Sequence, residues 1–372
     1  MVKLLAFYLP QFHPIKENDA WWGEGFTEWH NVTGAAPRFK GHYQPHLPSD
    51  LGFYDLRVAE TRNRQADLAK AYGIDGFCYY HYWFNGHQLL ERPLKEVLKE
   101  KQPDFPFCIC WANENWTRAW DGLENEVLIS QDYTKDDCLN HIRALAEYFE
   151  DDRYVKINEK PLFIVYRPDN IPDPRSYFEI WRNYALDVGL KGVHICAVKS
   201  GFSKYSEEEL ISLGFDSVLD FQPNREDFPK KSTRSQAVVD FARKTLPSKI
   251  FQYVKRNISM VNVIDYKSMV FYKISKPWPG NFTKFPCVFP SWDNSARRRS
   301  PTIIQNLDPK LYASWLEKSI ANVKAYTTEE QIVFINAWNE WAEGCHLEPD
   351  RKNNRAFLEI TKKIKESSEV EK

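Results

Sequence analysis

The segment 339–344 (NEWAEG) carries the residues best suited to chemistry, because its two carboxylates, Glu340 and Glu343, stand three positions apart. Carboxylates at this spacing can converge on one substrate if the segment makes a helical turn. Cleavage of a glycosidic bond needs one protonated carboxylic acid and one ionised carboxylate. Two neighbouring carboxylates raise one pKa and leave the other low, which supplies that division. A second interpretation stays open, in which this pair caps or solvates the start of a helix.

Other groups that could bind or catalyse are more ambiguous. For the remaining candidate carboxylates (Glu24, Glu28, Glu114 and Asp293), structural hydrogen bonding is favoured over catalysis. The candidate histidines lack helical i, i+4 spacing and a zinc-type pattern, so no metal or other cofactor is expected; they are His13, His81, His87 and His346. The run 297–299 (RRR) is typical of a solvated face, and alternatively could hold an anionic sugar or a phosphate.

Aromatic residues make up 15% of the 372 residues, and 13 of them are Trp. Ten of the Trp residues follow apolar runs or lie in the loop after the first run, rather than along the runs. Aromatic faces stack on sugar rings, and amides, carboxylates and Arg bind sugar hydroxyls. The residues predicted to bind a carbohydrate in this way are Gln11, His13, Trp22, Glu28, Tyr80, His81, Trp83, Trp111, Asn113, Glu114, Trp116, Arg167, Gln222, Trp292, Asp293, Arg297, Trp338 and Asn339.

The elements that must position these residues are read from periodicity. Eight short apolar runs predict strands at 3–10, 73–84, 105–114, 160–168, 192–200, 215–223, 285–294 and 331–341. Helical patterns predict helices at 56–72, 89–101, 135–150, 175–188, 206–213, 309–326 and 354–367, with a charged tail at 368–372.

Apolar strands that alternate with helices indicate a parallel sheet covered by helices. Eight such units predict an α/β fold of the (β/α)8 barrel type, a single domain over residues 1–372, while an open doubly wound sheet is the alternative. Two long insertions follow the first and sixth strands, at 11–55 and 224–284, the second with helices predicted at 235–246 and 261–274. In a barrel both insertions lie on the active-site face.

Composition excludes several other classes of protein. The 50 Lys and Arg balance 51 Asp and Glu, so nothing in the net charge attracts nucleic acid or an anionic membrane. No apolar stretch reaches the roughly 18–20 residues of a membrane span. The first apolar run is too short for a signal peptide, so a cytoplasmic location is expected. The seven Cys are odd in number and are expected to be buried small hydrophobes. The oligomeric state is left open.

Several blocks of sequence resemble the WbsX-type family encoded in polysaccharide and O-antigen gene clusters. They are YLPQFHP, WWGEGFTEWHNV, FCYYHYWF, CICWANENWTRAWDG and NAWNEWAEGCHLEPD, which extend from residue 7 to about residue 350. That family looks related to glycoside hydrolase family 99, the endo-α-mannosidase type. The resemblance implies a (β/α)8 barrel and a retaining reaction on an α-linked sugar without a metal.

The resemblance also implies a role for each carboxylate. Glu340 would be the base that deprotonates the substrate 2-hydroxyl, which attacks C1 and forms a 1,2-anhydro sugar. Glu343 would protonate the leaving oxygen and then activate water. The sequence departs from the hydrolase motif at Ala342, where the hydrolases carry His. This departure bears on contacts with the leaving group, and so on the sugar and the linkage.

Three functions are therefore compatible with the sequence. The favoured one is a retaining, endo-acting glycoside hydrolase that works on an oligosaccharide or polysaccharide through Glu340 and Glu343. The second is a glycosyltransferase or transglycosylase of polysaccharide or O-antigen assembly. The third is a non-catalytic glycan-binding barrel.

Overall fold

The computed structural model describes residues 1–118, 123–228, 245, 261–278 and 280–370. Apart from Thr245, the helix predicted at 235–246 lies outside the described residues. Trp120 and Asp121, which follow the third predicted strand, also lie outside them.

Eight parallel strands close into a barrel, because β1 pairs with both β14 and β2. Around the barrel the order is β1-β2-β4-β8-β9-β10-β12-β14, which is also the order along the chain. The (β/α)8 prediction is confirmed, and the open sheet is wrong. The strands, each of which coincides with one predicted apolar run, are Lys3–Tyr8 (β1), Gly76–Phe84 (β2), Phe107–Trp111 (β4), Lys160–Val165 (β8), His194–Lys199 (β9), Ser217–Asp220 (β10), Lys284–Val288 (β12) and Ile332–Ile335 (β14).

The strands are buried along almost their whole length because side chains fill both the inside and the outside of the barrel. Inside, the ring of Phe7 lies 5.2–5.6 Å from the rings of Tyr80, Phe221 and Phe334, measured between centroids. Outside, Tyr8 packs on Phe77 and Tyr79. All seven Cys are buried and free, as predicted.

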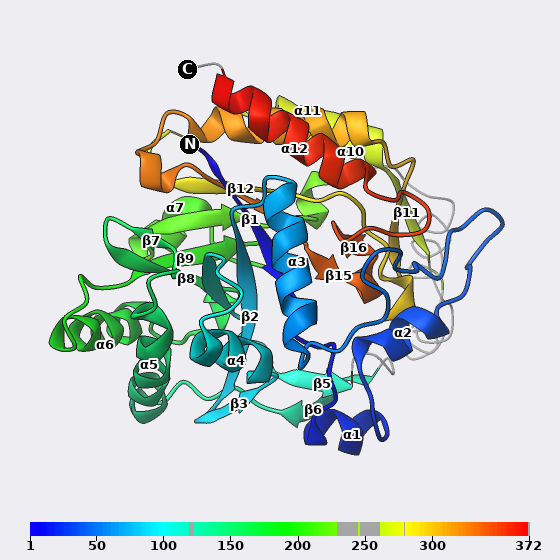
Figure 1. The fold of residues 1–372 in the computed structure, drawn as a ribbon. Helices are drawn as coiled ribbons and strands as arrows, with labels where there is room; N and C mark the ends of the chain where they lie inside the picture. The colour runs from blue at the N-terminus through cyan, green and yellow to red at the C-terminus, as the bar shows by residue number, and fades with distance from the viewer. Residues whose placement is uncertain (119–122, 229–244, 246–260, 279, 371–372) are drawn as a thin grey trace.

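Helices cover the outside of the barrel (Figure 1). Two of them begin with an Asp cap followed by Pro in the first turn, Asp173 before α6 and Asp308 before α11, a combination that favours helix initiation. The seven helices predicted outside the insertions are confirmed as Ala59–Ala71 (α3), Arg92–Glu100 (α4), Lys135–Phe149 (α5), Pro174–Asp187 (α6), Glu207–Ser212 (α7), Pro309–Val323 (α11) and Ala356–Val370 (α12). Since α12 extends to Val370, residues 368–370 continue this helix.

The second insertion corrects one prediction. Residues 261–274 do not form one helix, because Asn262–Asp265 (β11) pairs with Thr302–Gln305 (β13) in a small parallel sheet. The helix begins only at Tyr266, as Tyr266–Ser275 (α10), where the Asp265 side chain accepts a hydrogen bond from the amide of Ser268. The short turn Arg225–Asp227 (η3) begins the same insertion.

Several short elements lie at the carboxyl ends of the barrel strands. Lys16–Trp22 (α1) and Glu28–Gly34 (α2) belong to the first insertion. Trp116–Arg118 (β5) and Leu123–Ile129 (β6) form an antiparallel hairpin after β4. After β14, Asn339–Glu340 (β15) and Cys345–His346 (β16) pair across the turn Trp341–Glu343 (η6). Of two smaller strands, His87–Leu89 (β3) pairs with the carboxyl end of β2, whereas Lys156–Ile157 (β7) pairs with the amino end of β8.

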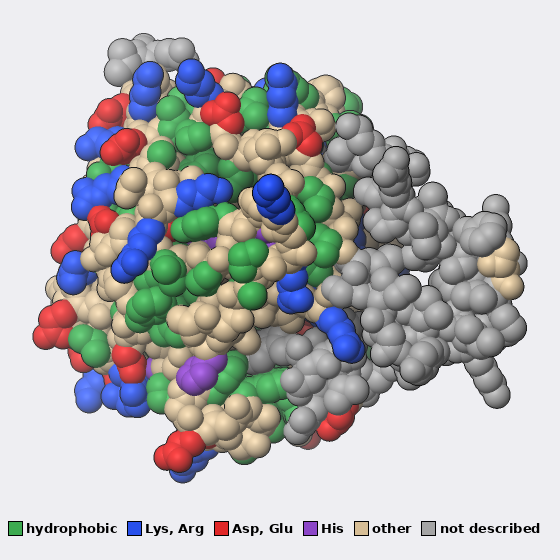
Figure 2. Space-filling view, turned by 90° about the vertical axis from the view of Figure 1, so that its right-hand side faces the viewer, with side chains coloured by type: hydrophobic (Ala, Val, Ile, Leu, Met, Phe, Trp, Pro, Cys, Tyr) green, Lys and Arg blue, Asp and Glu red, His purple; other side chains and the backbone are tan. Residues whose placement is uncertain are grey.

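Among the described residues on the face shown in Figure 2, acidic and basic side chains are interspersed with hydrophobic ones. Within the described residues, no helix is both long enough and apolar enough to cross a membrane.

Candidate active site

The segment 339–344 folds as a tight turn at the carboxyl end of β14. Glu340 is the last residue of β15, and Glu343 ends the 3-10 turn η6. Two hydrogen bonds from the loop after β12 hold the turn: the amide of Asp293 donates to the Glu343 carbonyl (2.7 Å), and Ser291 Oγ donates to the Gly344 carbonyl (2.6 Å).

Gly344 permits this close approach. Its φ of 55° is left-handed, and a Cβ atom here would lie 3.0–3.1 Å from Cβ, the amide nitrogen and the carbonyl oxygen of Asp293. A side chain at this position would therefore be strained and would push the turn away from β12. The glycine is needed to fix the carboxylates against the neighbouring strand end.

The two carboxylates meet on one guanidinium. Arg297 Nη2 lies 2.6 Å from Glu340 Oε1, and Arg297 Nη1 lies 3.5 Å from Glu343 Oε1. The same Nη2 lies 3.0 Å from Glu28 Oε2, which also accepts from Arg297 Nε at 3.1 Å. Glu28 belongs to α2, Arg297 follows β12 and the pair follows β14, so three segments distant in sequence converge on this site.

Burial governs the protonation of this cluster. The side chains of Glu28, Glu340 and Arg297 are 0%, 6% and 11% exposed, whereas that of Glu343 is 22% exposed. Burial raises the pKa of Glu340 to about 8; Arg297 opposes that rise, and Glu343 and Glu28 add to it. Burial likewise raises the pKa of Glu28. The two carboxyl groups of the pair thus stand in unlike environments, Glu340 buried with a raised pKa and Glu343 more exposed to water.

The surroundings of the cluster are fixed by further buried hydrogen bonds. Asp293 Oδ2 lies 2.6 Å from His42 Nε2 and accepts from Gln44 Nε2 at 2.8 Å, which ties the first insertion to the loop after β12. Asn339 joins the ends of β1 and β14, because its side chain bonds both the amide and the carbonyl of Leu9.

An open cleft of about 420 Å³ lies at the carboxyl ends of β4 and β8. Arg167 and Glu114 line it, with Arg167 Nε 2.7 Å from Glu114 Oε1. Asn113 is fully buried beneath them and bonds the backbone of Arg167 on both sides. The predicted residues Asn113, Glu114 and Arg167 are therefore brought together, as a cleft wall and its support.

Four predicted binding residues lie elsewhere, because their side chains point outward from the barrel into helix packing. His81 contacts His141 of α5 (3.0 Å between Nε2 atoms), and Trp83 Nε1 donates to Asp137 of the same helix. Trp111 is fully buried and packs on Trp181 of α6. Trp338 is fully buried against Phe77. These four residues support the fold rather than a cleft, which corrects the sequence-based assignment.

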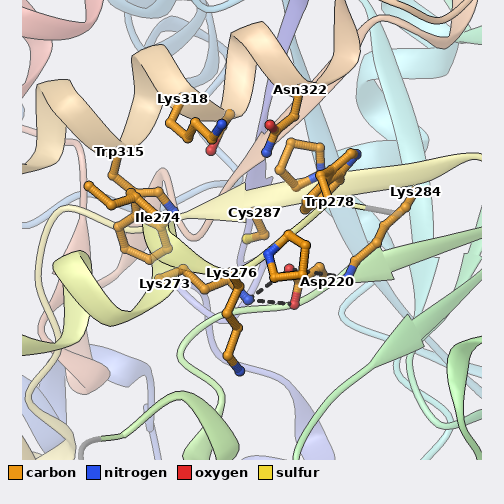
Figure 3. A pocket seen from close by; sticks show the side chains of 13 residues that line it. Asp220, Lys273, Ile274, Lys276, Trp278, Lys284, Cys287, Trp315, Lys318 and Asn322 are labelled. Carbon is orange, nitrogen blue, oxygen red and sulfur yellow. Dashed lines mark hydrogen bonds and ion pairs between the residues drawn. The ribbon is translucent and has the colours of Figure 1, made fainter. Parts of the chain in front are cut away.

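Gln222 is also directed away from the cluster. It is fully buried and donates to Asp227, next to the ion pairs of Lys273 with Asp220 and Asp227. A cavity of about 50 Å³ adjoins these ion pairs. Figure 3 shows its lining residues, with Lys318 and Asn322 on α11 and the contact between Lys273 and Asp220 among them. None of the predicted site residues lines this cavity.

Six predicted residues remain, three of which lie in the first insertion. The Gln11 carbonyl accepts from the amide of Glu28, and His13 is buried nearby in the chain. Trp22 packs on Phe26. The other three are Tyr80, which faces Tyr166, Trp116, which packs on Trp21 and Tyr82, and the partly buried Trp292.

The sequence did not single out three further features. His42 and Gln44 bind the Asp293 side chain. The one sequence signal for this is that His42, Gln44 and His46 alternate in HYQPH, as residues on one face of an extended segment do. Glu348 is buried and accepts from Tyr54, Gln65 and Trp341, and burial raises its pKa to about 7. His46 meets His346 across 300 positions, a pairing that no local spacing could reveal.

Comparison with known proteins gives a family match over nearly the whole chain. The family model described as Glycosyltransferase WbsX matches residues 4–361. The uncharacterized protein WxcX from two strains of Xanthomonas campestris pv. campestris is 41% identical over 362 residues, which is 96% of this chain and 49% of each relative. The chain thus spans about half the length of the curated relatives it matches.

Solved structures share the fold at low sequence identity. The family 99 endo-α-mannosidase from Bacteroides thetaiotaomicron, in complex with bis-tris propane, is 14% identical with a TM-score of 0.58, over 99% of this chain and 97% of that one. A protein described as glycoside hydrolase-like is 12% identical with a TM-score of 0.59, over 98% and 93%. These neighbours support the barrel assignment.

Replacing Trp111 separates packing from sugar binding. Because Trp111 is fully buried between the barrel and α6, Trp111→Ala should lower the free energy of unfolding by about 3–5 kcal/mol in urea denaturation. Leu186→Ala, an exposed site on the same helix α6, should change it by less than about 0.5 kcal/mol. A stable Trp111→Ala variant would contradict the packing role.

Replacing Arg297 tests the charge balance of the cluster. Arg297→Met leaves Glu28 and Glu340 buried without their cation, which should cost about 3–5 kcal/mol of stability at pH 9. Burial raises the pKa of Glu340 in the folded protein from 4.5 to about 8, which favours the protonated form. The proton on Glu340 therefore stabilises the fold; this contribution is fully present below pH 4.5 and is lost as the pH rises through 8. Without the cation this pKa rises further, so the penalty should be smaller at pH 5.

The matched control is Arg182→Met, because Arg182 forms an ion pair with Asp216 that is about one-third exposed on each side. A surface pair of this kind contributes about 0–1 kcal/mol, so this variant should show a small loss with little change between pH 5 and 9. An Arg297→Met penalty that is no larger at pH 9 than at pH 5 would contradict the proposed cluster electrostatics.

Proposed function

The chain belongs to the WbsX family, and from that premise we propose that it is a carbohydrate-active enzyme, specifically a retaining endo-acting glycoside hydrolase for an α-linked glycan. The observation that carries the proposal is the convergence of Glu340 and Glu343 on Arg297 at the carboxyl end of the barrel. In barrel enzymes this end holds the active site.

The proposed reaction gives each carboxylate one task. Glu340 in its ionised form takes the proton of the 2-hydroxyl while that oxygen attacks C1, and the bond from C1 to the leaving oxygen breaks. Glu343 donates its proton to the leaving oxygen. Water, deprotonated by Glu343, then opens the 1,2-anhydro sugar at C1, and O2 recovers its proton from Glu340. Two inversions at C1 give net retention.

The geometry favours this route over direct attack by an enzyme carboxylate. In the usual retaining arrangement the two carboxyl groups flank the scissile bond. Here both carboxylates come from one short turn and face one guanidinium, so they approach a bound sugar from the same side. A raised pKa also makes Glu340 a stronger base toward a hydroxyl once it is ionised.

Polar groups near the turn are suited to sugar hydroxyls. Gln11 Oε1 and Glu28 Oε1 are buried and have no hydrogen-bond partner among the described residues. Unpaired buried oxygens cost free energy, and a hydroxyl that reached them would recover it. The open cleft beside Arg167 lies at the carboxyl ends of β4 and β8, on the same face of the barrel as the turn, and would suit a substrate longer than one sugar.

Glycosyl transfer is the second candidate, and the description of the family as glycosyltransferases favours it. The same 1,2-anhydro sugar can be opened by a hydroxyl of an acceptor sugar instead of water, with Glu343 as base in both cases. The two outcomes therefore share one active site and differ in what enters it. In both reactions the protein acts on a polysaccharide.

The decisive experiment is a screen of polysaccharides with product analysis, combined with two substitutions. Glu340→Gln and Glu343→Gln should each lower kcat at least about 10³-fold while glycan binding is retained, because each removes a proton-transfer group. Glu24→Gln, in an exposed turn of the first insertion, is the matched control and should leave kcat unchanged.

The products distinguish the alternatives. Hydrolysis in ¹⁸O water should place the label on C1 of an α-configured product. Products elongated by an added acceptor would favour the transferase, and binding without turnover of any glycan would leave a binding barrel. Near-wild-type kcat for either Gln variant would contradict the mechanism.

The pH dependence tests the raised pKa within the pair. The mechanism needs the pair to carry one proton, so kcat/KM should fall about tenfold per pH unit as the pH rises above 8, the pKa that burial gives to Glu340 in the free enzyme. A kcat/KM that stays constant to pH 10 would contradict this pKa. The groups whose charges interact with Glu340 are Arg297, Glu28, Glu343, Tyr80, Tyr82 and Cys345.

Because Glu28 raises the pKa of Glu340, Glu28→Gln should move this limb to lower pH, whereas Glu24→Gln should leave it in place.

A further inference from the structure

A second buried cluster lies behind the catalytic turn, where the first insertion meets the closing loop of the barrel. His46 Nδ1 lies 3.1 Å from His346 Nε2, and Asp350 Oδ2 lies 3.8 Å from the same Nε2. These three ligand atoms all lie within 4.8 Å of one another, and all three residues are buried. Among the described residues, they form the one group of His, Cys, Asp and Glu side chains with this compactness.

Each of the three side chains is oriented by its surroundings. His346 Nδ1 lies 3.0 Å from the Glu348 carbonyl oxygen and donates to it, which leaves the lone pair of Nε2 directed at His46. The imidazole of His346 also stacks on Trp341, with ring centroids 3.7 Å apart. Asp350 accepts from the amide of Lys352 and from Asn353 Nδ2 (2.9 Å), which holds its carboxylate toward His346.

We propose that His46, His346 and Asp350 bind one divalent transition-metal ion of the Zn²⁺ type. With metal–ligand bonds of about 2.0–2.2 Å, neighbouring ligand atoms of a tetrahedral site lie about 3.3–3.6 Å apart. The separations of 3.1 and 3.8 Å bracket that range, and the third pair, His46 with Asp350, lies within 4.8 Å. Two imidazoles and one carboxylate also match the ligand preference of Zn²⁺.

The surrounding hydrogen bonds are those that metal-binding histidines use. A ligating His commonly donates its other ring N–H to a carbonyl, as His346 does to Glu348. The ion would replace the proton that His46 and His346 now share.

This site goes beyond the proposed function, and it takes no part in the chemistry assigned to Glu340 and Glu343. The ion would clamp the first insertion, which carries Glu28, to the loop that follows the catalytic turn. His346 pairs with Asn339 across β15 and β16, and His346 stacks on Trp341 of η6. Metal binding would therefore stabilise the position of the turn.

Cobalt provides a direct readout of the site. The protein, purified without an oligohistidine tag and treated with a chelator, is titrated with Co²⁺ and followed by visible absorption, with Zn²⁺ as competitor. We expect one Co²⁺ per chain, tetrahedral absorption bands, displacement by one equivalent of Zn²⁺ and a higher melting temperature for the loaded protein. Stoichiometric Zn²⁺ in untreated protein by elemental analysis would agree.

Substitutions assign the signal to these residues. His46→Gln and His346→Gln should abolish the cobalt bands, and Asn353→Ala, which removes a hydrogen bond to Asp350, should weaken binding about 10- to 100-fold. His194→Gln is the matched control, because His194 is also buried but bonds Ser217 on a barrel strand. The cobalt absorption bands should persist in this variant.

The proposal is overturned if the chelated wild-type protein takes up no stoichiometric Co²⁺ or Zn²⁺, a result that needs no variant to fold. It is also overturned if folded His46→Gln binds Co²⁺ like the wild type. Neither result bears on catalysis by Glu340 and Glu343, so the two proposals fail separately.

Discussion

The structure around the candidate active site depends on one buried cation. Arg297 supplies the positive charge for Glu28 and Glu340, whose side chains are almost wholly withdrawn from water, and it reaches Glu343 as well. Two buried carboxylates without a cation would take up protons or open the site to solvent. The first insertion, the loop after β12 and the turn after β14 must therefore assemble around Arg297 together.

This constraint explains why the surrounding loops are joined by buried polar contacts. The Asp293 side chain binds His42 and Gln44, while its backbone amide holds the Glu343 carbonyl. Gly344 lets those backbones approach. Each contact fixes one loop against another, so the guanidinium and the carboxylates keep one geometry rather than several. Because water entering the site would lower the pKa of Glu340, these contacts help to keep that pKa raised.

The barrel could be predicted from the sequence because eight separate apolar runs each indicate one strand. Each apolar run and each helical pattern is a local signal, and an error in one would not change the count. The site was predicted less completely, since periodicity does not give the phase of a strand. Within β2, Tyr80 points into the barrel while His81 points outward to α5, and a shift of one residue exchanges them. The same uncertainty placed Trp111 and Trp338 in a sugar cleft, although both are fully buried in packing contacts. The pairing of Glu28 with Arg297 joins positions 269 residues apart, which no pattern along the chain can reveal.

The structure of the turn changes the interpretation of Ala342, the position at which the sequence departs from the family 99 motif. Ala342 lies between the two carboxylates in sequence, and the change from His was expected to alter contacts with the leaving group. Its side chain is fully buried, however, and it offers no surface to the cleft. A larger residue would have to displace packed neighbours, and in a close-packed interior that would move the turn itself. The small side chain of Ala342 is therefore part of the packing that holds the turn in place. The open cleft is lined by other side chains, among them the ion pair of Arg167 with Glu114.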